Sequence, residues 1–139
     1  MQPYFTTDPR DASTCKIAYD ESNNWLRATW SGFVDPLEAN KGAESYLHYA
    51  AQSGCTYLLN DNSRLRGPWF DSLDWLAQVW LPQATTLGLR AVAHIVQADQ
   101  QSDTLTNHLP LALPFDLQVF HNPADAEHWL RQQSQPPAG

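Results

Sequence analysis

Basic residues are scarce in this chain of 139 residues. Eight lysines and arginines stand against fifteen aspartates and glutamates, which gives a formal net charge of −7 at pH 7. Nucleic acids and anionic membrane surfaces are bound by basic protein surfaces. The charge balance therefore argues against both as main partners, and we expect no nucleic-acid partner.

Long apolar runs and cysteine pairs are also lacking. No run approaches the roughly 20 residues of a membrane span, and the first residues, MQPYFTTDPR, lack the basic start and apolar core of a signal peptide. We therefore expect a cytoplasmic protein without stable membrane insertion. Cys15 and Cys55 make no disulfide framework and have no metal-ligand spacing. Each adjoins an apolar strand pattern, so we predict two buried thiols, with no metal and no cofactor.

The first half of the chain predicts a hairpin followed by a helix. Residues 15–19 and 25–30 alternate apolar and polar side chains, and a polar turn joins them, as in an antiparallel pair of strands. Asp35 and Glu38 flank a proline in the pattern of a helix start. The predicted helix runs to about Gln52, and Gly54 ends it.

The second half continues with strands and helices in alternation. Residues 56–59 are short and apolar, which favours a central strand. The polar run of residues 60–63 predicts a turn, and apolar residues at three- and four-residue steps over 73–87 predict a helix. Pro82 predicts a kink or break near Leu81. Residues 91–96 and 117–120 are further strands, with a short helix near 108–114 between them, and Asn122 opens a last helix.

The predicted class is therefore α/β, with the order β-β-α-β-α-β-short α-β-α. A hairpin leads into a mixed five-stranded sheet with helices packed over it. We predict a loosely ordered arm over residues 1–13, one domain over 14–133 and a disordered tail over 134–139. The strand-to-helix turn after residue 59 would lie at the carboxyl end of the sheet, where α/β proteins commonly bind ligands.

The order of elements resembles that of STAS domains, the anti-sigma-factor-antagonist-like fold, and in particular the small bacterial STAS/SEC14-type, SpoIIAA-like proteins. The resemblance covers roughly residues 14–131 and is carried by the stretches WLRATWSGFVDPLEA, YLLNDNSRLRGPWFDSLDWLAQVW, LRAVAHIV and VFHNPADAEHWL. It implies a STAS-like regulatory module in bacterial signalling. It also implies that Ser63 matches the serine or threonine that a partner kinase phosphorylates, although Asn62 and Arg64 replace the family's serine and glycine.

The turn itself offers a candidate regulatory site. Ser63, with Asp61 and Asn62, is a candidate phosphoacceptor turn, or simply a turn serine that satisfies nearby backbone groups. Arg64 and Arg66 are candidate contacts for an anion or a partner carboxylate. Alternatively they pair within the chain, with Asp61 or with the acids at positions 71 and 74.

The following helix carries more large apolar side chains than one sheet can easily cover. They are candidates for an interface or an apolar pocket: Trp69, Phe70, Trp75, Val79 and Trp80. A homodimer seam or a partner groove is one interpretation. A pocket for a small apolar ligand under the kinked helix is another, and a thick aromatic core is the third.

Catalysis has the weakest support in the sequence. His94 lies within an apolar strand, which is typical of a core histidine, and pairing it with Asp61 for hydrolysis is the remaining enzyme hypothesis. No nucleophile elbow or glycine-rich phosphate loop accompanies the two residues. The leading hypothesis is a non-catalytic, STAS-like interaction module, expected to be a homodimer, that uses residues 60–80. The alternative is a carrier or sensor of a small apolar, lipid-like ligand, and a hydrolase comes third.

Overall fold

The computed structural model describes residues 4–7, 13–66, 75–96 and 113–134. Its elements are, in chain order, β1 (Tyr4–Thr7), β2 (Thr14–Asp20), β3 (Trp25–Phe33), α1 (Pro36–Ser53), β4 (Tyr57–Arg66), the π-helix η2 (Leu76–Trp80), α3 (Leu81–Thr86), β5 (Ala91–Ile95), β6 (Asp116–Phe120) and α5 (Pro123–Ser134). The alternation of strands and helices confirms the predicted α/β class.

One mixed sheet holds all the described strands, in the order β1-β2-β3-β4-β5-β6. The pairs β1–β2 and β2–β3 are antiparallel, whereas the later pairs are parallel. Five of these strands are those that the sequence predicts. The sixth, β1, comes from the segment for which we predicted a loosely ordered arm, and it pairs with β2 along its whole length.

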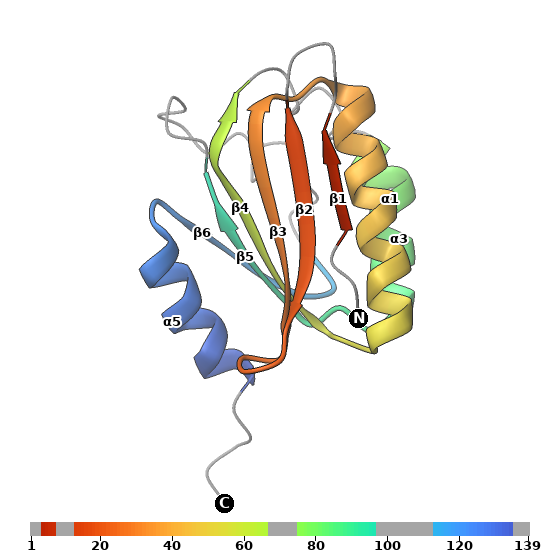
Figure 1. Ribbon diagram of the computed structural model, residues 1–139. Coiled ribbons are helices and arrows are strands. Elements are labelled where there is room, and N and C mark those ends of the chain that lie inside the picture. Colours follow the sequence, from red (N-terminus) through yellow and green to blue (C-terminus); the bar gives the residue numbers. More distant parts are fainter. Residues whose placement is uncertain (1–3, 8–12, 67–74, 97–112, 135–139) are drawn as a thin grey trace, which may run out of the picture.

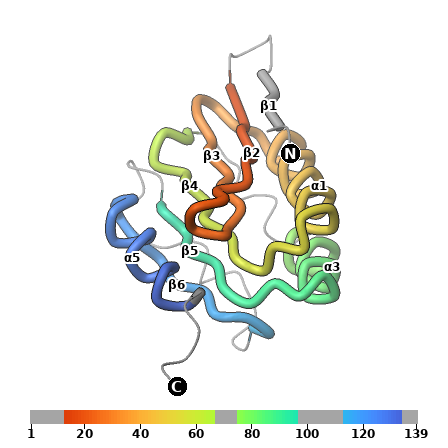
Figure 2. Tube along the Cα trace, turned by 60° about the horizontal axis from the view of Figure 1, so that its bottom comes forward, coloured from red at the N-terminus to blue at the C-terminus, as the bar shows by residue number. Residues whose placement is uncertain are grey.

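Helices cover both faces of the sheet (Figure 1). On one face lie α1 and the continuous helical segment η2–α3, and on the other lies α5, which packs on β4, β5 and β6. The view along another direction shows the same separation (Figure 2). Among the described residues, none of the helices combines the length and apolarity needed to cross a bilayer.

Helix α1 begins and ends where the sequence places its signals. The Asp35 carboxylate accepts a hydrogen bond from the Glu38 backbone N–H at 2.8 Å, and Pro36 occupies the first turn. This is the N-cap arrangement, which satisfies one of the free amide groups at a helix start. Gly54 ends the helix in the left-handed region at φ 67°, where a residue without Cβ is favoured.

Strand β4 corrects one sequence expectation. The predicted turn at residues 60–63 is wrong, because β4 runs unbroken to Arg66. Its polar residues are accommodated because successive side chains point to opposite faces of the sheet and find partners on both. Asp61 lies opposite Thr29 of β3 and Arg64 opposite Ser31, so β4 carries one extra residue between these pairs, which is a β-bulge.

The helical segment after β4 changes type at Leu81, where Pro82 predicts an irregularity. The backbone N–H of Leu81 bonds to the Leu76 carbonyl, five residues earlier, and α3 begins with Pro82 in its first turn. A proline lacks the N–H that an uninterrupted α-helix requires. The π-helical turn before Pro82 accommodates this break in the hydrogen-bond pattern. The side-chain amide of Gln83 also donates to the Val79 carbonyl at 3.0 Å.

Candidate functional site

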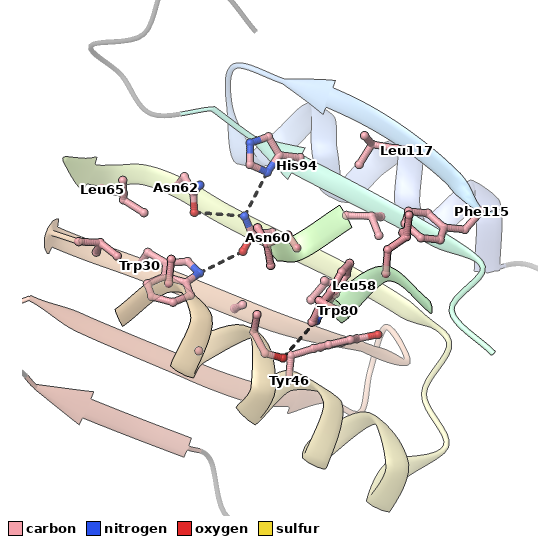
Figure 3. A pocket seen from close by; sticks show the side chains of 18 residues that line it. Trp30, Tyr46, Leu58, Asn60, Asn62, Leu65, Trp80, His94, Phe115 and Leu117 are labelled. Carbon is pink, nitrogen blue, oxygen red and sulfur yellow. Dashed lines mark hydrogen bonds between the residues drawn. The ribbon is translucent and has the colours of Figure 1, made fainter. Parts of the chain in front are cut away.

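A cavity of about 120 Å³ lies between the sheet and the helices on its α1 face (Figure 3). Strands β3, β4, β5 and β6 form its floor, and α1, η2 and α3 form its roof. The cavity is partly open. Most of the side chains that line it are apolar, including Ala28, Val34, Leu58, Leu65, Leu76, Leu81, Val92 and Leu117.

Aromatic rings form a large part of the cavity wall. Trp30, Tyr46, Trp80 and Phe115 all line it. The rings of Tyr46 and Trp80 meet at 5.6 Å with an interplanar angle of 48°, a tilted contact of the kind that aromatic pairs prefer. The Trp80 indole N–H donates to the Ala43 carbonyl of α1 at 3.1 Å, which anchors η2 to the neighbouring helix.

Trp30 reaches the cavity because α1 has a glycine where the two meet. A Cβ atom built on Gly42 would lie 2.1 Å from Cη2 of the Trp30 ring, far inside contact distance. The glycine therefore lets the ring lie directly against the helix backbone. This close approach places the indole N–H of Trp30 beside β4.

A chain of hydrogen bonds crosses the cavity floor at one end. The Trp30 indole N–H donates to Asn60 Oδ1 at 3.1 Å, and Asn60 Nδ2 donates to Asn62 Oδ1 at 3.1 Å. Asn60 Nδ2 also lies 3.1 Å from Nδ1 of His94. Asn62 and His94 are 2% and 4% exposed. The strands create this arrangement, because Asn60 and Asn62 share one face of β4 and His94 is the register partner of Asn60 on β5.

The chemistry of these groups fixes their orientations. An indole nitrogen can only donate, so the atom of Asn60 that faces Trp30 is the oxygen, and Nδ2 faces Asn62 and His94. Nδ1 of His94 must then accept, which makes His94 neutral with its proton on Nε2. We call Trp30, Asn60, Asn62 and His94 the polar chain of the cavity. Its members are all uncharged.

The other described side chains of the cavity wall are also uncharged. None of the described lining residues is Asp, Glu, Lys or Arg. Burial, with a smaller contribution from nearby Cys55, raises the pKa of Tyr46 well above its usual value, so the phenol stays protonated. In the part of the chain that the structure describes, no group of three or more His, Cys, Asp or Glu side chains is placed to hold a metal ion.

The other face of β4 holds a charged cluster. Asp61 accepts a hydrogen bond from the Ser63 hydroxyl at 2.6 Å and another from the Ser63 backbone N–H at 2.9 Å. Its second carboxylate oxygen lies 3.7 Å from the Arg27 guanidinium, which in turn pairs with Glu127 of α5 at 2.6 Å. The Ser63 hydroxyl thus has a local acceptor. The candidate regulatory residues Asp61 and Asn62 point to opposite faces.

Two sequence expectations about this cluster are wrong. Asp61 does not meet His94, because the register sets Asp61 against Ile95 and puts His94 on the cavity face. Asp61 pairs with Arg27 and not with Arg64 or Arg66, which are both exposed on β4. The acids at positions 71 and 74, the other expected partners of these arginines, lie outside the described residues.

The five candidate aromatic and apolar residues have different outcomes. Trp69 and Phe70 lie outside the described residues. Trp75 is half-buried, and Val79 is 40% exposed on η2. Trp80 lines the cavity. The predicted location of an apolar pocket, under the helix that Pro82 interrupts, therefore coincides with the observed cavity.

The sequence did not indicate a site role for Trp30, and it indicated Asn60 only as part of the proposed interaction surface over residues 60–80. The available signal was a pair of asparagines two residues apart at the end of an apolar strand, with a histidine inside the next one. That pattern places three polar groups on one face of a parallel pair. This pattern did not lead to a predicted site, because the same asparagines also favour a turn.

The sequence matches no protein-family model, and no curated protein is significantly similar to it.

Proposed function

We propose that this protein binds a small, mostly apolar molecule in the cavity between β3–β6 and the helices above them. The observation that carries the proposal is an apolar, partly open cavity with a few polar groups gathered at one end. Ligand sites in proteins commonly combine an apolar lining with a few placed polar groups. Interiors that serve packing alone leave few voids larger than a water molecule.

The size of the cavity limits the ligand to about one ring. A dry apolar cavity of about 150 Å³ in another protein holds benzene, and the cavity here measures about 120 Å³. A long lipid chain exceeds this space. The ligand is therefore of the size of a substituted benzene, and the protein acts as its carrier or sensor.

Binding without a chemical step fits the polar groups that line the cavity. Asn60 uses its oxygen and both amide hydrogens in the polar chain, and Nδ1 of His94 is engaged by Asn60. Amide and indole groups orient a ligand but are poor nucleophiles. The serine with an acidic neighbour, Ser63, lies on the far side of the sheet from the cavity.

A cavity-filling variant tests this proposal. Ala43 lines the cavity from α1, so Ala43→Leu places a larger side chain in it. Ala51→Leu adds the same group to an exposed position of the same helix and is the matched control. We expect toluene to bind the native protein and Ala51→Leu saturably, measured by tryptophan fluorescence, and to bind Ala43→Leu at least tenfold more weakly. Equal affinity for all three proteins, or no saturable binding by the native chain, would contradict the proposal.

A second candidate function is a regulatory protein contact, because the exposed side chain of Val79 lies on η2 next to Trp80. In this hypothesis the protein is a STAS-like module that forms a homodimer or binds a partner through η2. Its support is the order of elements and the exposure of Val79. Membership of the STAS family is part of this second proposal.

Light scattering tests the contact. We expect a dimer for the native chain and a monomer for Val79→Asp, whereas the neighbouring exposed change Gln78→Asp leaves the dimer intact. A native chain that is monomeric at every concentration rules out the homodimer.

A further inference from the structure

We propose that the ligand carries a neutral oxygen acceptor, such as a ketone or amide carbonyl, which accepts a hydrogen bond from Nδ2 of Asn62. The inference rests on the proposed function and names the chemical class of the molecule in the cavity. It follows from the direction of the hydrogen bonds in the polar chain and from the absence of charge in the described lining.

Asn62 is a donor held inside the cavity wall. The chain of hydrogen bonds begins at the Trp30 indole, which can only donate, and ends with Asn62 Oδ1 accepting from Asn60. The Nδ2 group of Asn62 is thereby left to donate. Among the described residues it has no acceptor, although Asn62 is only 2% exposed and lines the cavity. A donor that faces an apolar cavity without a protein acceptor is poorly satisfied, and a ligand oxygen at this end supplies the missing partner.

The neutrality of the acceptor follows from the charges around the cavity. No cationic side chain is found in the described lining, and His94 is neutral in the tautomer that the polar chain requires. The buried carboxylate of Asp61 lies on the same strand, which further disfavours a second negative charge nearby. An anion buried without a countercharge is strongly penalised. A carbonyl oxygen accepts the same hydrogen bond without that penalty.

The rest of the ligand is expected to be flat and apolar. Figure 3 shows Trp30, Asn60, Asn62 and His94 at one end of the cavity, with Tyr46, Trp80 and Phe115 towards the other. An aromatic ring with a carbonyl substituent places its ring against the aromatic residues and its oxygen at Asn62. Acetophenone has this form, with one ring and one small substituent.

Three probes of similar shape test the inference on the full chain. In α-methylstyrene a CH₂ group replaces the oxygen of acetophenone, and benzoate adds a negative charge. By tryptophan fluorescence we expect acetophenone to bind roughly five- to tenfold more tightly than α-methylstyrene, the value of one net hydrogen bond. We expect benzoate to bind more weakly than both. Equal affinities for acetophenone and α-methylstyrene overturn the inference but leave the proposed function standing, and benzoate as the tightest ligand overturns neutrality. If none of the three binds, the proposed function fails.

A variant assigns the preference to one residue. Asn62→Leu keeps the approximate volume and removes the donor, so we expect the preference for acetophenone over α-methylstyrene to fall to about twofold or less. Gln118→Leu removes an exposed amide from β6, next to the lining residue Leu117, and should keep the full preference. An unchanged preference in Asn62→Leu contradicts the assignment.

The native protein provides a measurement that does not depend on how Asn62→Leu folds. The carbonyl stretch of bound acetophenone should shift to lower frequency than in an alkane solvent, because a hydrogen bond weakens the C=O bond. A stretch at the alkane frequency shows an oxygen without a donor and overturns the inference.

Discussion

The polar residues on the two faces of β4 make different kinds of interaction, neutral hydrogen bonds on one face and ion pairs on the other. On the cavity face, Asn60 and Asn62 join Trp30 and His94 in an uncharged chain of hydrogen bonds. On the α5 face, the adjacent residue Asp61 belongs to a cluster of opposite charges. The comparison shows that a strand can separate a neutral, ligand-sized space from an ion-pair network only one residue away. Substitutions that alter one face of β4 and not the other therefore test this account.

The largest expected effect comes from the contact that shapes the cavity face. Gly42→Ala adds a Cβ that overlaps the Trp30 ring, so the ring must move and the polar chain must break. We expect a loss of about 3 kcal/mol in the free energy of unfolding, even though alanine favours helices. Urea denaturation measures it. Glu44→Ala, at an exposed position of the same helix, should change stability little, and a similar result for both variants would refute the close contact.

A smaller effect is expected from breaking the polar chain itself. Asn60→Leu leaves the Trp30 indole N–H without its acceptor and removes the group that orients His94. Because an unsatisfied buried donor costs roughly 1–3 kcal/mol, we expect a loss of about 2 kcal/mol. The loss should not depend on salt, since the groups are neutral. A stability equal to that of the native chain in urea denaturation would show that the polar chain contributes nothing.

The charged face should respond less strongly and with a different salt dependence. Arg27→Met removes the ion pairs with the buried Asp61 and with Glu127, and both Arg27 and Glu127 are partly exposed. Ion pairs of this kind contribute modestly, so we expect a loss of about 1 kcal/mol at low salt that shrinks in 1 M NaCl. Chemical denaturation by urea at both salt concentrations measures the difference. A loss that exceeds that of Asn60→Leu would reverse the ranking of the two faces.

The smallest effect is expected when the cysteines of the native protein are exposed to a thiol reagent. Both Cys15 and Cys55 are buried, as the sequence predicts, and burial raises the pKa of the Cys15 thiol to about 12. The thiolate is the reactive form, and a raised pKa keeps the thiol protonated at pH 8. We therefore expect native protein to resist maleimide labelling on the timescale that labels urea-unfolded protein fully. Rapid labelling in the native state would show that one thiol is accessible.

The sequence predicts the α/β class and most of its helices and strands because caps and periodicity are local properties. Asp35, Pro36 and Gly54 define α1 through contacts within a few residues of each end, and the alternation of residues 15–19 identifies β2 without any knowledge of its neighbours. The additional strand β1 was not predicted, since its pairing with β2 depends on a tertiary contact.

The candidate site is harder to predict because it depends on register. Residues 60–63 contain the side chains that favour turns, and local chemistry does not show that Trp30 and His94 supply partners for them within a sheet. The cavity was expected only in outline, beneath the helix containing Trp80 and Pro82. The role of Gly42 depends on the path of α1 over β3, which the sequence pattern does not specify.

The most direct test of the account is an NMR titration of the tryptophan indole N–H groups with acetophenone. Trp30 and Trp80 line the cavity, whereas Trp25 packs beneath Arg131 and Trp129 against Phe120. We predict saturable shifts of the Trp30 and Trp80 signals, while the Trp25 and Trp129 signals stay in place. Shifts confined to Trp25 and Trp129, or no saturable shift at Trp30 and Trp80, would contradict binding in the cavity.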